Sequence, residues 1–176
     1  MDFIDSLFSR KSIRSYTGEC VSEKDLNTIL LAGNAAPVGK GRYDALHITV
    51  ISDPSLLEEI DKLTAEYLGK PDTHPLYGAP HLIVVSIKED CGLPDNVNYS
   101  NAAIVAHNMA LSAMSLNIGT CLIWGAIRAV NESVEIVKKL QLPIGFRPSC
   151  AITLGQTVEN YSPREIPADK ISQNSI

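Results

Sequence analysis

A segment that is apolar on nearly every face most constrains how this chain can fold. The helical spacing over residues 99–116 leaves no continuous polar face, because its apolar positions include Ala102, Ala103, Ile104, Val105, Ala106, Met109, Ala110, Leu111, Ala113 and Met114. A helix of this kind is buried, either in the core of its own domain or between two subunits. Its many small residues would also let another backbone approach closely. The fold must therefore enclose this helix, within one chain or between two.

Hydrophobic periodicity and turn residues predict the other elements. Helices are expected at 2–8 with Asp2 as N-cap, at 22–33 after a capping-box-like Ser22, at 54–67 after Asp53-Pro54, and at 131–140 with Asn131 as N-cap. Strands are expected at 46–51, 82–87, 120–124 and 149–154. The long connection 69–80, rich in Pro and Gly, is typical of a binding loop or lid.

This order predicts an α+β fold with a central mixed or antiparallel sheet flanked by helices and one buried helix. No G-x-G-x-x-G follows the first strand and no Walker-type loop is present, so a doubly wound nucleotide-binding fold is not expected. The length of 176 residues suits one domain, 1–176, in which 156–176 forms an extended C-terminal tail.

Composition and charge narrow the possible partners and compartment. A net charge of −5 argues against nucleic acid or an anionic membrane as partner, and no apolar stretch approaches the ~20 residues of a membrane span. The N-terminus lacks the pattern of a signal peptide. The cysteines are scattered, and the histidines show no metal-ligand spacing. We therefore expect a cytoplasmic protein without a disulfide framework or a metal.

The strongest local motif is Arg10-Lys11-Ser12-Ile13-Arg14, followed by Tyr16. In an extended chain Arg10, Ser12 and Arg14 would point the same way, roughly 7 Å apart. Two guanidinium groups with a hydroxyl between them can hold an elongated anion such as a phosphate ester. The alternative is a solvated basic loop.

Taken together, several segments resemble the FMN-dependent nitroreductase family over nearly the whole chain. They are, in order, Arg10 to Tyr16, Ala35-Ala36-Pro37, Ala79-Pro80, the apolar helix containing Asn108, Asn117 to Gly125, Leu142 to Gly145 and Ala151 to Gly155. The resemblance implies a nitroreductase-like fold, FMN as cofactor, NADH or NADPH as reductant, and a homodimer built on the apolar helix. The chain would be a short member of the family.

The resemblance also implies roles for individual residues. Arg10, Lys11 and Ser12 would hold the phosphate and ribityl chain, and Arg14 would lie nearer the pyrimidine edge of the ring. The backbone near Trp124 and Gly125 would face flavin N5, while Arg164 in the tail would close over the phosphate. Each has an alternative role: a surface ion pair for Arg14, packing for Trp124, a strand-ending turn for Gly125 and a tail charge for Arg164.

One segment departs from the family pattern. After the Ala-Pro of the second loop most relatives carry polar Ser and Asn or Gln residues, whereas this chain has Val38-Gly39-Lys40-Gly41-Arg42. Pro37, Val38 and Gly39 remain expected cofactor contacts, and the roles of Lys40 and Arg42 stay open. His107 and Asn108 are expected to be hydrogen-bonded polar residues within the core rather than catalytic groups.

The function that the sequence favours is an FMN-dependent oxidoreductase. NAD(P)H would reduce the flavin and leave, and a small-molecule acceptor such as a nitroaromatic or a quinone would then be reduced by a ping-pong mechanism. FMN supplies this chemistry, so no catalytic side chain is expected. The alternatives are a non-enzymatic flavin-binding or delivery protein, and a dehalogenase or flavin-destructase relative on the same fold. The sequence names neither the physiological acceptor nor the preferred nucleotide.

Overall fold

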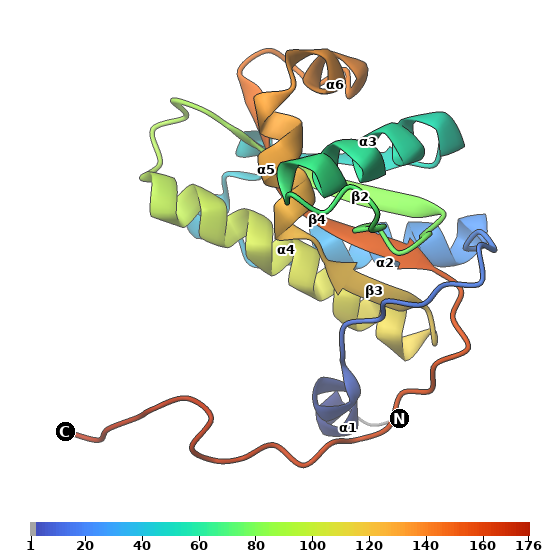
Figure 1. Ribbon diagram of the computed structural model, residues 1–176. Helices are drawn as coiled ribbons and strands as arrows, with labels where there is room; N and C mark the ends of the chain where they lie inside the picture. Colours follow the sequence, from blue (N-terminus) through green and yellow to red (C-terminus); the bar gives the residue numbers. More distant parts are fainter. Residues whose placement is uncertain (1–2) are drawn as a thin grey trace.

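The computed structural model describes residues 3–176, so the predicted N-cap Asp2 lies outside the described residues. Helices and strands alternate irregularly along the chain (Figure 1). The elements are α1 (Phe3–Ser9), α2 (Glu23–Asn34), the short 3-10 turns η1 (Gly39–Gly41) and η2 (Tyr43–Ala45), β1 (Leu46–Ile51), α3 (Pro54–Tyr67), β2 (His81–Lys88), α4 (Asp95–Ser115), β3 (Gly119–Leu122), α5 (Trp124–Glu132), α6 (Val134–Lys139) and β4 (Phe146–Gly155).

The four strands form one antiparallel sheet in the order β1-β2-β4-β3. The two central strands are almost wholly buried, because β2 and β4 carry apolar side chains toward both faces. β3 is short and lies at one edge of the sheet. Of the two sheet types expected from the sequence, the antiparallel one is therefore correct.

Helices cover both faces of the sheet. One apolar cluster joins α2 and α4 to the face that carries Ile83, Val85 and Ile152. A second cluster joins α3, α5 and α6 to the face that carries Val84 and Ala151. Figure 1 shows α3, α5 and α6 above the sheet and α4 below it. The alternation of side chains along each strand thus divides the core into two layers.

Local sequence signals determine several boundaries. Ser22 caps α2, and its hydroxyl accepts a hydrogen bond from the Asp25 N–H at 3.1 Å. Asp53 caps α3 in the same way, with Leu56 N as donor at 2.8 Å and Pro54 at the first helical position. β1 coincides with the predicted strand. Residues 156–176 contain neither helix nor strand, as expected for an extended tail.

The segment after β3 is where the sequence prediction is wrong. The predicted strand 120–124 ends at Leu122, and Trp124 and Gly125 instead open α5. Asn131 does not cap the following helix. It lies inside α5 and donates from Nδ2 to the Pro148 carbonyl, while Ser133 caps α6. The buried residues of α5 recur with a helical period: Ala126, Ile127, Ala129 and Val130. The sequence did not predict this helix because Gly125 resembles a residue that ends a strand.

α4 begins at Asp95, four residues before the predicted start, and is buried on one face only. Its inner face includes Ala102, Ala106 and Ala110, which are at most 2% exposed. Ile104 on the other face is 38% exposed. Within a single chain, the apolar surface of this helix is therefore only partly covered.

His81, at the start of β2, joins three segments of the chain. Its Nε2 accepts a hydrogen bond from Val21 N at 3.2 Å, and its Nδ1 lies 2.7 Å from the Ser52 hydroxyl. Burial lowers the pKa of His81, which favours the neutral ring. An imidazolium could not accept from Val21 N. The contact therefore requires the neutral ring.

This contact predicts a loss of stability in mild acid. The folded pKa lies below the unfolded value of about 6.5, so the contribution is intact above that pH and is lost as pH falls toward the folded pKa. The pKa of His107 is also lowered, so both proteins that are compared, with and without His81→Gln, carry His107→Gln. Urea unfolding at pH 7.5 and 5.5 should show that the loss of unfolding free energy between the two pH values is smaller after His81→Gln. An unchanged loss would exclude this role for His81.

Candidate functional site

The N-terminal motif lies along the edge strand of the sheet. Ile13 N donates to the Thr120 carbonyl of β3 at 2.8 Å, and Thr17 N donates to the Gln156 carbonyl just after β4 at 3.0 Å. Ile13 is fully buried and packs with Met114 and Tyr161. The motif is therefore anchored by backbone bonds and by one apolar side chain.

Side chains of the motif differ in what they contact. Lys11 Nζ lies 2.8 Å from Glu159 Oε2 of the tail, and Ile13 packs into the core. Arg14 is exposed, while Ser12 and Arg10 are half-buried. Whether Arg10, Ser12 and Arg14 share one side of the segment stays a prediction. Lys11, by contrast, is engaged with the tail.

Two glycines allow the motif to lie against the sheet. Gly119 and Gly155 are partners in the β3–β4 register. A Cβ on Gly119 would lie 2.9 Å from Ile13 Cγ2, and a Cβ on Gly155 would lie 2.5 Å from Pro80 Cδ and 3.1 Å from the Tyr16 ring. We call this pair the glycine cradle. Any larger residue there would push the N-terminal segment or Pro80 away from the sheet.

Tyr16 completes the attachment from the motif side. Its hydroxyl donates to the Ile13 carbonyl at 3.1 Å and lies 2.7 Å from the Thr153 hydroxyl of β4. Burial raises the pKa of Tyr16, so the hydroxyl stays protonated. The end of the motif is thereby held at a fixed place on the sheet.

Arg164 lies beside the motif, and its role toward a phosphate stays a prediction. Its Nε donates to the Phe8 carbonyl at 3.0 Å and its Nη2 to the Arg10 carbonyl at 2.6 Å. Tyr161, three residues earlier, donates its hydroxyl to the Ile118 carbonyl. In Figure 1 the tail passes next to α1, away from the body of the molecule. Arg164 therefore both fixes the entry to the motif and adds positive charge beside Arg10.

The guanidinium groups of Arg10 and Arg14 have no carboxylate partner. In the part of the chain that the structure describes, the ion pairs involve neither residue. Arg10 is close enough to His107 for its charge to lower the pKa of that ring, after burial as the larger cause. Arg14 lies over the Tyr77 ring, 6.0 Å from its centroid, and a hydrogen bond with Tyr77 raises the Arg14 pKa. Unpaired cations with a free hydroxyl between them suit a phosphate monoester.

Trp124 and Gly125 form the first turn of α5, at the end of β3. The N-cap residue, Ile123, offers no side-chain acceptor to the first N–H groups of the helix, which also lack partners within it. A Cβ on Gly125 would come no closer than 3.6 Å to the protein, against Leu68. Trp124 is 53% exposed. Gly125 is therefore not required by packing within the chain, and its amide is available to a ligand.

The loop with Pro37, Val38 and Gly39 is attached elsewhere in the chain. Gly39 N donates to Asn101 Oδ1 at 2.9 Å near the start of α4, whereas Arg10 lies beside His107, six residues further along. That spacing corresponds to roughly 9 Å of helix rise. The single chain therefore does not place this loop among the residues of the motif.

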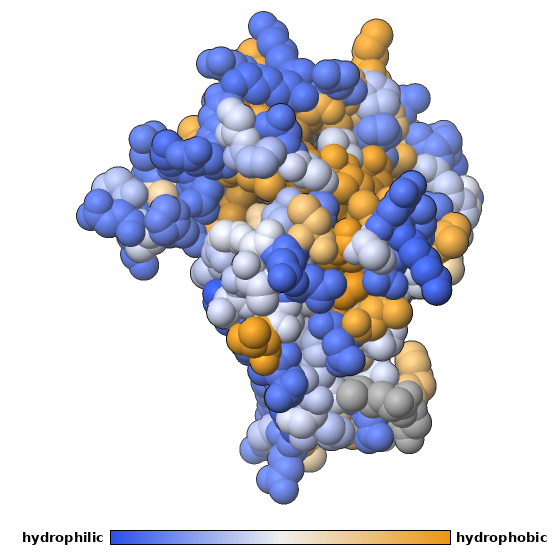
Figure 2. Space-filling view, turned by 90° about the vertical axis from the view of Figure 1, so that its right-hand side faces the viewer, coloured by the Kyte–Doolittle hydropathy of each residue, from blue (hydrophilic) through white to orange (hydrophobic). Residues whose placement is uncertain are grey.

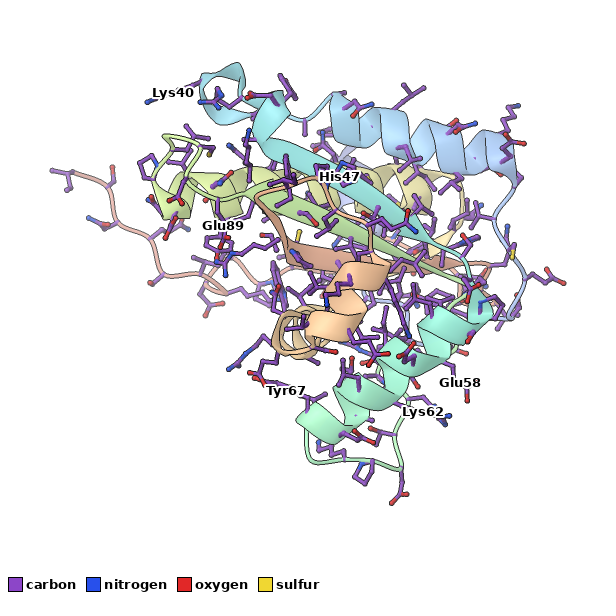
Figure 3. The ribbon with its side chains drawn as sticks, turned by 90° about the horizontal axis from the view of Figure 1, so that it is seen from above. Lys40, His47, Glu58, Lys62, Tyr67 and Glu89 are labelled. Carbon is purple, nitrogen blue, oxygen red and sulfur yellow. The ribbon has the colours of Figure 1, made fainter. Side chains whose placement is uncertain are left out.

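This loop carries two cations, Lys40 and Arg42, where most relatives have polar residues. The structure gives Arg42 a clear role. Arg42 binds Asp44 through Nε and Nη2, at 2.8 and 3.0 Å, and donates from Nη1 to the Cys91 carbonyl. It joins the loop to the segment before α4. Lys40 is exposed in a left-handed conformation, with φ 57°, and Figure 3 shows it at the outer end of this loop.

Sequence reasoning missed several supporting residues and misjudged one. His107 is on the exposed face of α4 and not in the core, because the helix is buried on one side only. Asn108 donates from Nδ2 to the Ala32 carbonyl, as expected of a satisfied polar group. Tyr77 and Glu159 were not singled out, since neither belongs to a recognisable motif. The sequence places Gly119 just before the predicted strand 120–124 and Gly155 just after 149–154, and it gives no sign of their packing role.

Two kinds of site find no support among residues 3–176. No group of histidine, cysteine or acidic residues in that range is arranged to hold a metal ion. Within the same range, no helix combines the length and apolarity that crossing a membrane would require. The four cysteines are free thiols, of which Cys121 and Cys150 are buried.

Comparison with known proteins identifies the family of this chain. The family model described as the nitroreductase family matches residues 7–156. A protein named as an NADH dehydrogenase/NAD(P)H nitroreductase from Methanothermobacter thermautotrophicus is 28% identical over 94% of this chain and 83% of its own length. The FMN reductase (NADPH) of Bacillus subtilis is 27% identical, and the matched region covers 86% of this chain and 64% of that protein. A solved nitroreductase with bound FMN from Desulfitobacterium hafniense superposes with a TM-score of 0.81, covering 97% and 96% of the two chains at 25% identity.

The chain belongs to the nitroreductase family, because the family model covers most of its length, including the N-terminal motif and the glycine cradle. The predicted α+β, nitroreductase-like fold is thus confirmed.

Proposed function

We propose that this protein is an FMN-dependent oxidoreductase that uses NAD(P)H to reduce small acceptors such as nitroaromatics or quinones. The observation that carries the proposal is that Arg10 and Arg14, with Ser12 between them on the sheet edge, belong to none of the ion pairs found among residues 3–176. Family membership and the FMN-bound structural relative support the same function. When bound, FMN would accept electrons from the nucleotide and pass them to the acceptor.

The chain's own residues would bind and orient the cofactor. Arg10 and Ser12 would hold the phosphate end, with Arg164 beside them, and Arg14 would supply positive charge near the ring. The free amide of Gly125 would approach the ring from the first turn of α5. Lys11 would act indirectly, by fixing the tail through Glu159. No side-chain acid or base is assigned, because positioning and charge suffice for transfer to a stacked ring.

Steady-state kinetics test this assignment. Varying NAD(P)H at several fixed concentrations of a quinone should give parallel double-reciprocal lines, since one substrate leaves before the next binds. Intersecting lines would indicate that both substrates must be bound together, which would contradict alternation at a single site.

Arg14→Gln should separate the electronic role of Arg14 from binding. Arg14 is exposed and held only by Tyr77, so its loss should leave the fold intact. Removing a positive charge near the ring should lower the reduction potential of bound FMN. The potential is measured by reductive titration against a reference dye, and the FMN dissociation constant by fluorescence. A large loss of affinity with an unchanged potential would place Arg14 in phosphate binding instead.

We further propose that residues 1–176 act as one FMN-binding domain within a cytoplasmic homodimer. Two observations support a second copy. The outer face of α4 leaves Ile104 exposed, and the loop with Pro37, Val38 and Gly39 lies apart from the motif within one chain. A second chain packed on α4 would cover the first and bring the partner's loop toward the motif.

Ile104→Glu should dissociate this dimer. A charge at the partly exposed Ile104 opposes association but does not have to enter the core of the chain. Ala106 is fully buried, so a charge there would disrupt the fold itself. Asn27→Glu, at an exposed position on α2, is the matched control. Sedimentation velocity should show a dimer for the native chain and for Asn27→Glu and a monomer for Ile104→Glu. A native chain that is monomeric with FMN bound would exclude the dimer.

A further inference from the structure

A cavity of about 800 Å³ lies beside the loop that carries Tyr77. Its walls come from the segment after Tyr16, the first half of α3 and the loop before β2. Figure 2 shows this side of the molecule, with an apolar area surrounded by polar side chains. Apolar lining is contributed by Pro54, Leu57, Leu76, Ala79 and Pro80. Neither the arginines of the motif nor Trp124 and Gly125 line the cavity, so it is separate from the candidate FMN site.

The loop that forms one wall is held in place without a ligand. Asp61 of α3 accepts from Leu76 N at 2.7 Å through Oδ1, and its Oδ2 lies 2.8 Å from His74 Nδ1. The Asp61 side chain is only 13% exposed, so its bond to Leu76 N is partly shielded from water, whereas His74 is exposed. Gly78 takes the left-handed conformation, φ 70°, that lets the loop turn back toward β2. The cavity is therefore preformed, as ligand pockets usually are.

The charges around the cavity disfavour an anion. Its ionisable lining consists of Glu58, Asp61, His74, Tyr77 and Cys20, with no lysine or arginine. Glu58 is paired with Lys62 at 2.6 Å, and Figure 3 shows the two side chains near one another on α3. A negatively charged ligand would meet two carboxylates and no lysine or arginine in the lining, while Arg14 lies over the ring of the lining residue Tyr77. The volume and apolar walls suit a neutral molecule of about drug size.

We propose that this cavity is a second small-molecule site that binds a neutral, largely apolar compound. The site does not depend on FMN and goes beyond the oxidoreductase function. Its occupant would also contact Tyr77, the residue that lies under Arg14. Tyr77 is thus shared between the cavity and the candidate cofactor site.

Cys20 provides a local probe of occupancy. It lines the cavity and is exposed, whereas Cys121 and Cys150 are buried. Cys91, half-buried in the segment before α4, lies outside the cavity and serves as an internal control. Alkylation of each cysteine by iodoacetamide is followed by peptide mass spectrometry on the protein as purified, without reductant. The ligands are 4-nitrobenzamide, which is neutral, and 4-nitrobenzoate, which has nearly the same shape but is anionic.

Saturating 4-nitrobenzamide should slow alkylation of Cys20 by at least roughly fivefold, because thiol reactivity follows access. The rate at Cys91 should not change, and 4-nitrobenzoate should protect neither cysteine. Unprotected Cys20 at saturating 4-nitrobenzamide, or equal protection by both compounds, would overturn the proposal.

A pair of substitutions tests the same site without the thiol probe. Cys20→Trp should fill the cavity from its exposed rim, and Cys20→Ser should leave it open. Calorimetric titration with 4-nitrobenzamide should show one binding event fewer per chain for Cys20→Trp than for the native protein, with Cys20→Ser like the native protein. Native-like binding by a folded Cys20→Trp variant, checked by circular dichroism, would contradict the assignment.

Discussion

Alanine at either position of the glycine cradle is expected to release FMN and destabilise the fold together. Gly155→Ala would place a methyl group 2.5 Å from the rigid Pro80 ring, and Gly119→Ala would place one 2.9 Å from Ile13. Neither contact can be relieved by rotating a flexible side-chain end, so the N-terminal segment or Pro80 must move. Overpacking of this kind costs about 1–3 kcal/mol. Since the same segment carries Arg10 and Ser12, FMN affinity should fall as well.

Gly125→Ala is the matched control for the fold. Its new Cβ would meet only Leu68, at 3.6 Å, and alanine is favoured over glycine in a helix. Thermal unfolding without FMN should therefore show a lower Tm for Gly119→Ala and Gly155→Ala but not for Gly125→Ala. FMN affinity is measured on all three by flavin fluorescence. A Gly155→Ala variant with native Tm and native affinity would mean that the cradle does not position the motif.

Arg10→Ala should cause the largest loss of FMN affinity of any single side-chain truncation in the motif. A charge-assisted hydrogen bond contributes about 1.5–3 kcal/mol, so affinity should fall by roughly 10- to 150-fold. Ser12→Ala removes only a neutral donor and should weaken binding by less. Because the Arg10 side chain has no carboxylate partner in the described part of the chain, its removal leaves no buried charge behind.

Arg147→Ala is the control for the loss of one positive charge. Arg147 lies at the start of β4 and pairs with Glu89 at 3.0 Å. Titration of each variant with FMN at two ionic strengths should show weaker and less salt-sensitive binding for Arg10→Ala, and native-like binding for Arg147→Ala. If Arg10→Ala and Arg147→Ala weaken binding equally, the effect is one of overall charge and Arg10 does not contact the phosphate.

Local signals in the sequence predicted much of the fold. Helix caps such as Ser22 and Asp53 can be recognised from the few residues that follow them. The alternation of side chains that marks β1 is equally local. The Arg10 to Tyr16 segment was also recognisable, because extended geometry alone places alternate side chains on one side. These features depend on neighbours in sequence and require no knowledge of the tertiary structure.

Other features depend on contacts between distant residues. The role of Gly119 and Gly155 becomes visible only once Ile13, Tyr16 and Pro80 are packed against them. The sequence could not predict which face of α4 packs against the sheet, because apolar residues occur on all sides of this helix. That face is determined by contacts with the sheet. The contact of Arg14 with Tyr77 joins segments more than sixty positions apart, so no local pattern signals it.

The central claim is that bound FMN passes electrons from a nicotinamide nucleotide to an acceptor. The most direct measurement is the visible spectrum of the purified protein under anaerobic conditions, before and after mixing with NADH or NADPH in a stopped-flow instrument. We expect a yellow protein whose flavin absorbance is lost rapidly with at least one nucleotide and returns when a quinone is added. A protein that binds no FMN, or one whose flavin stays oxidised for minutes in excess of both nucleotides, would contradict the assignment.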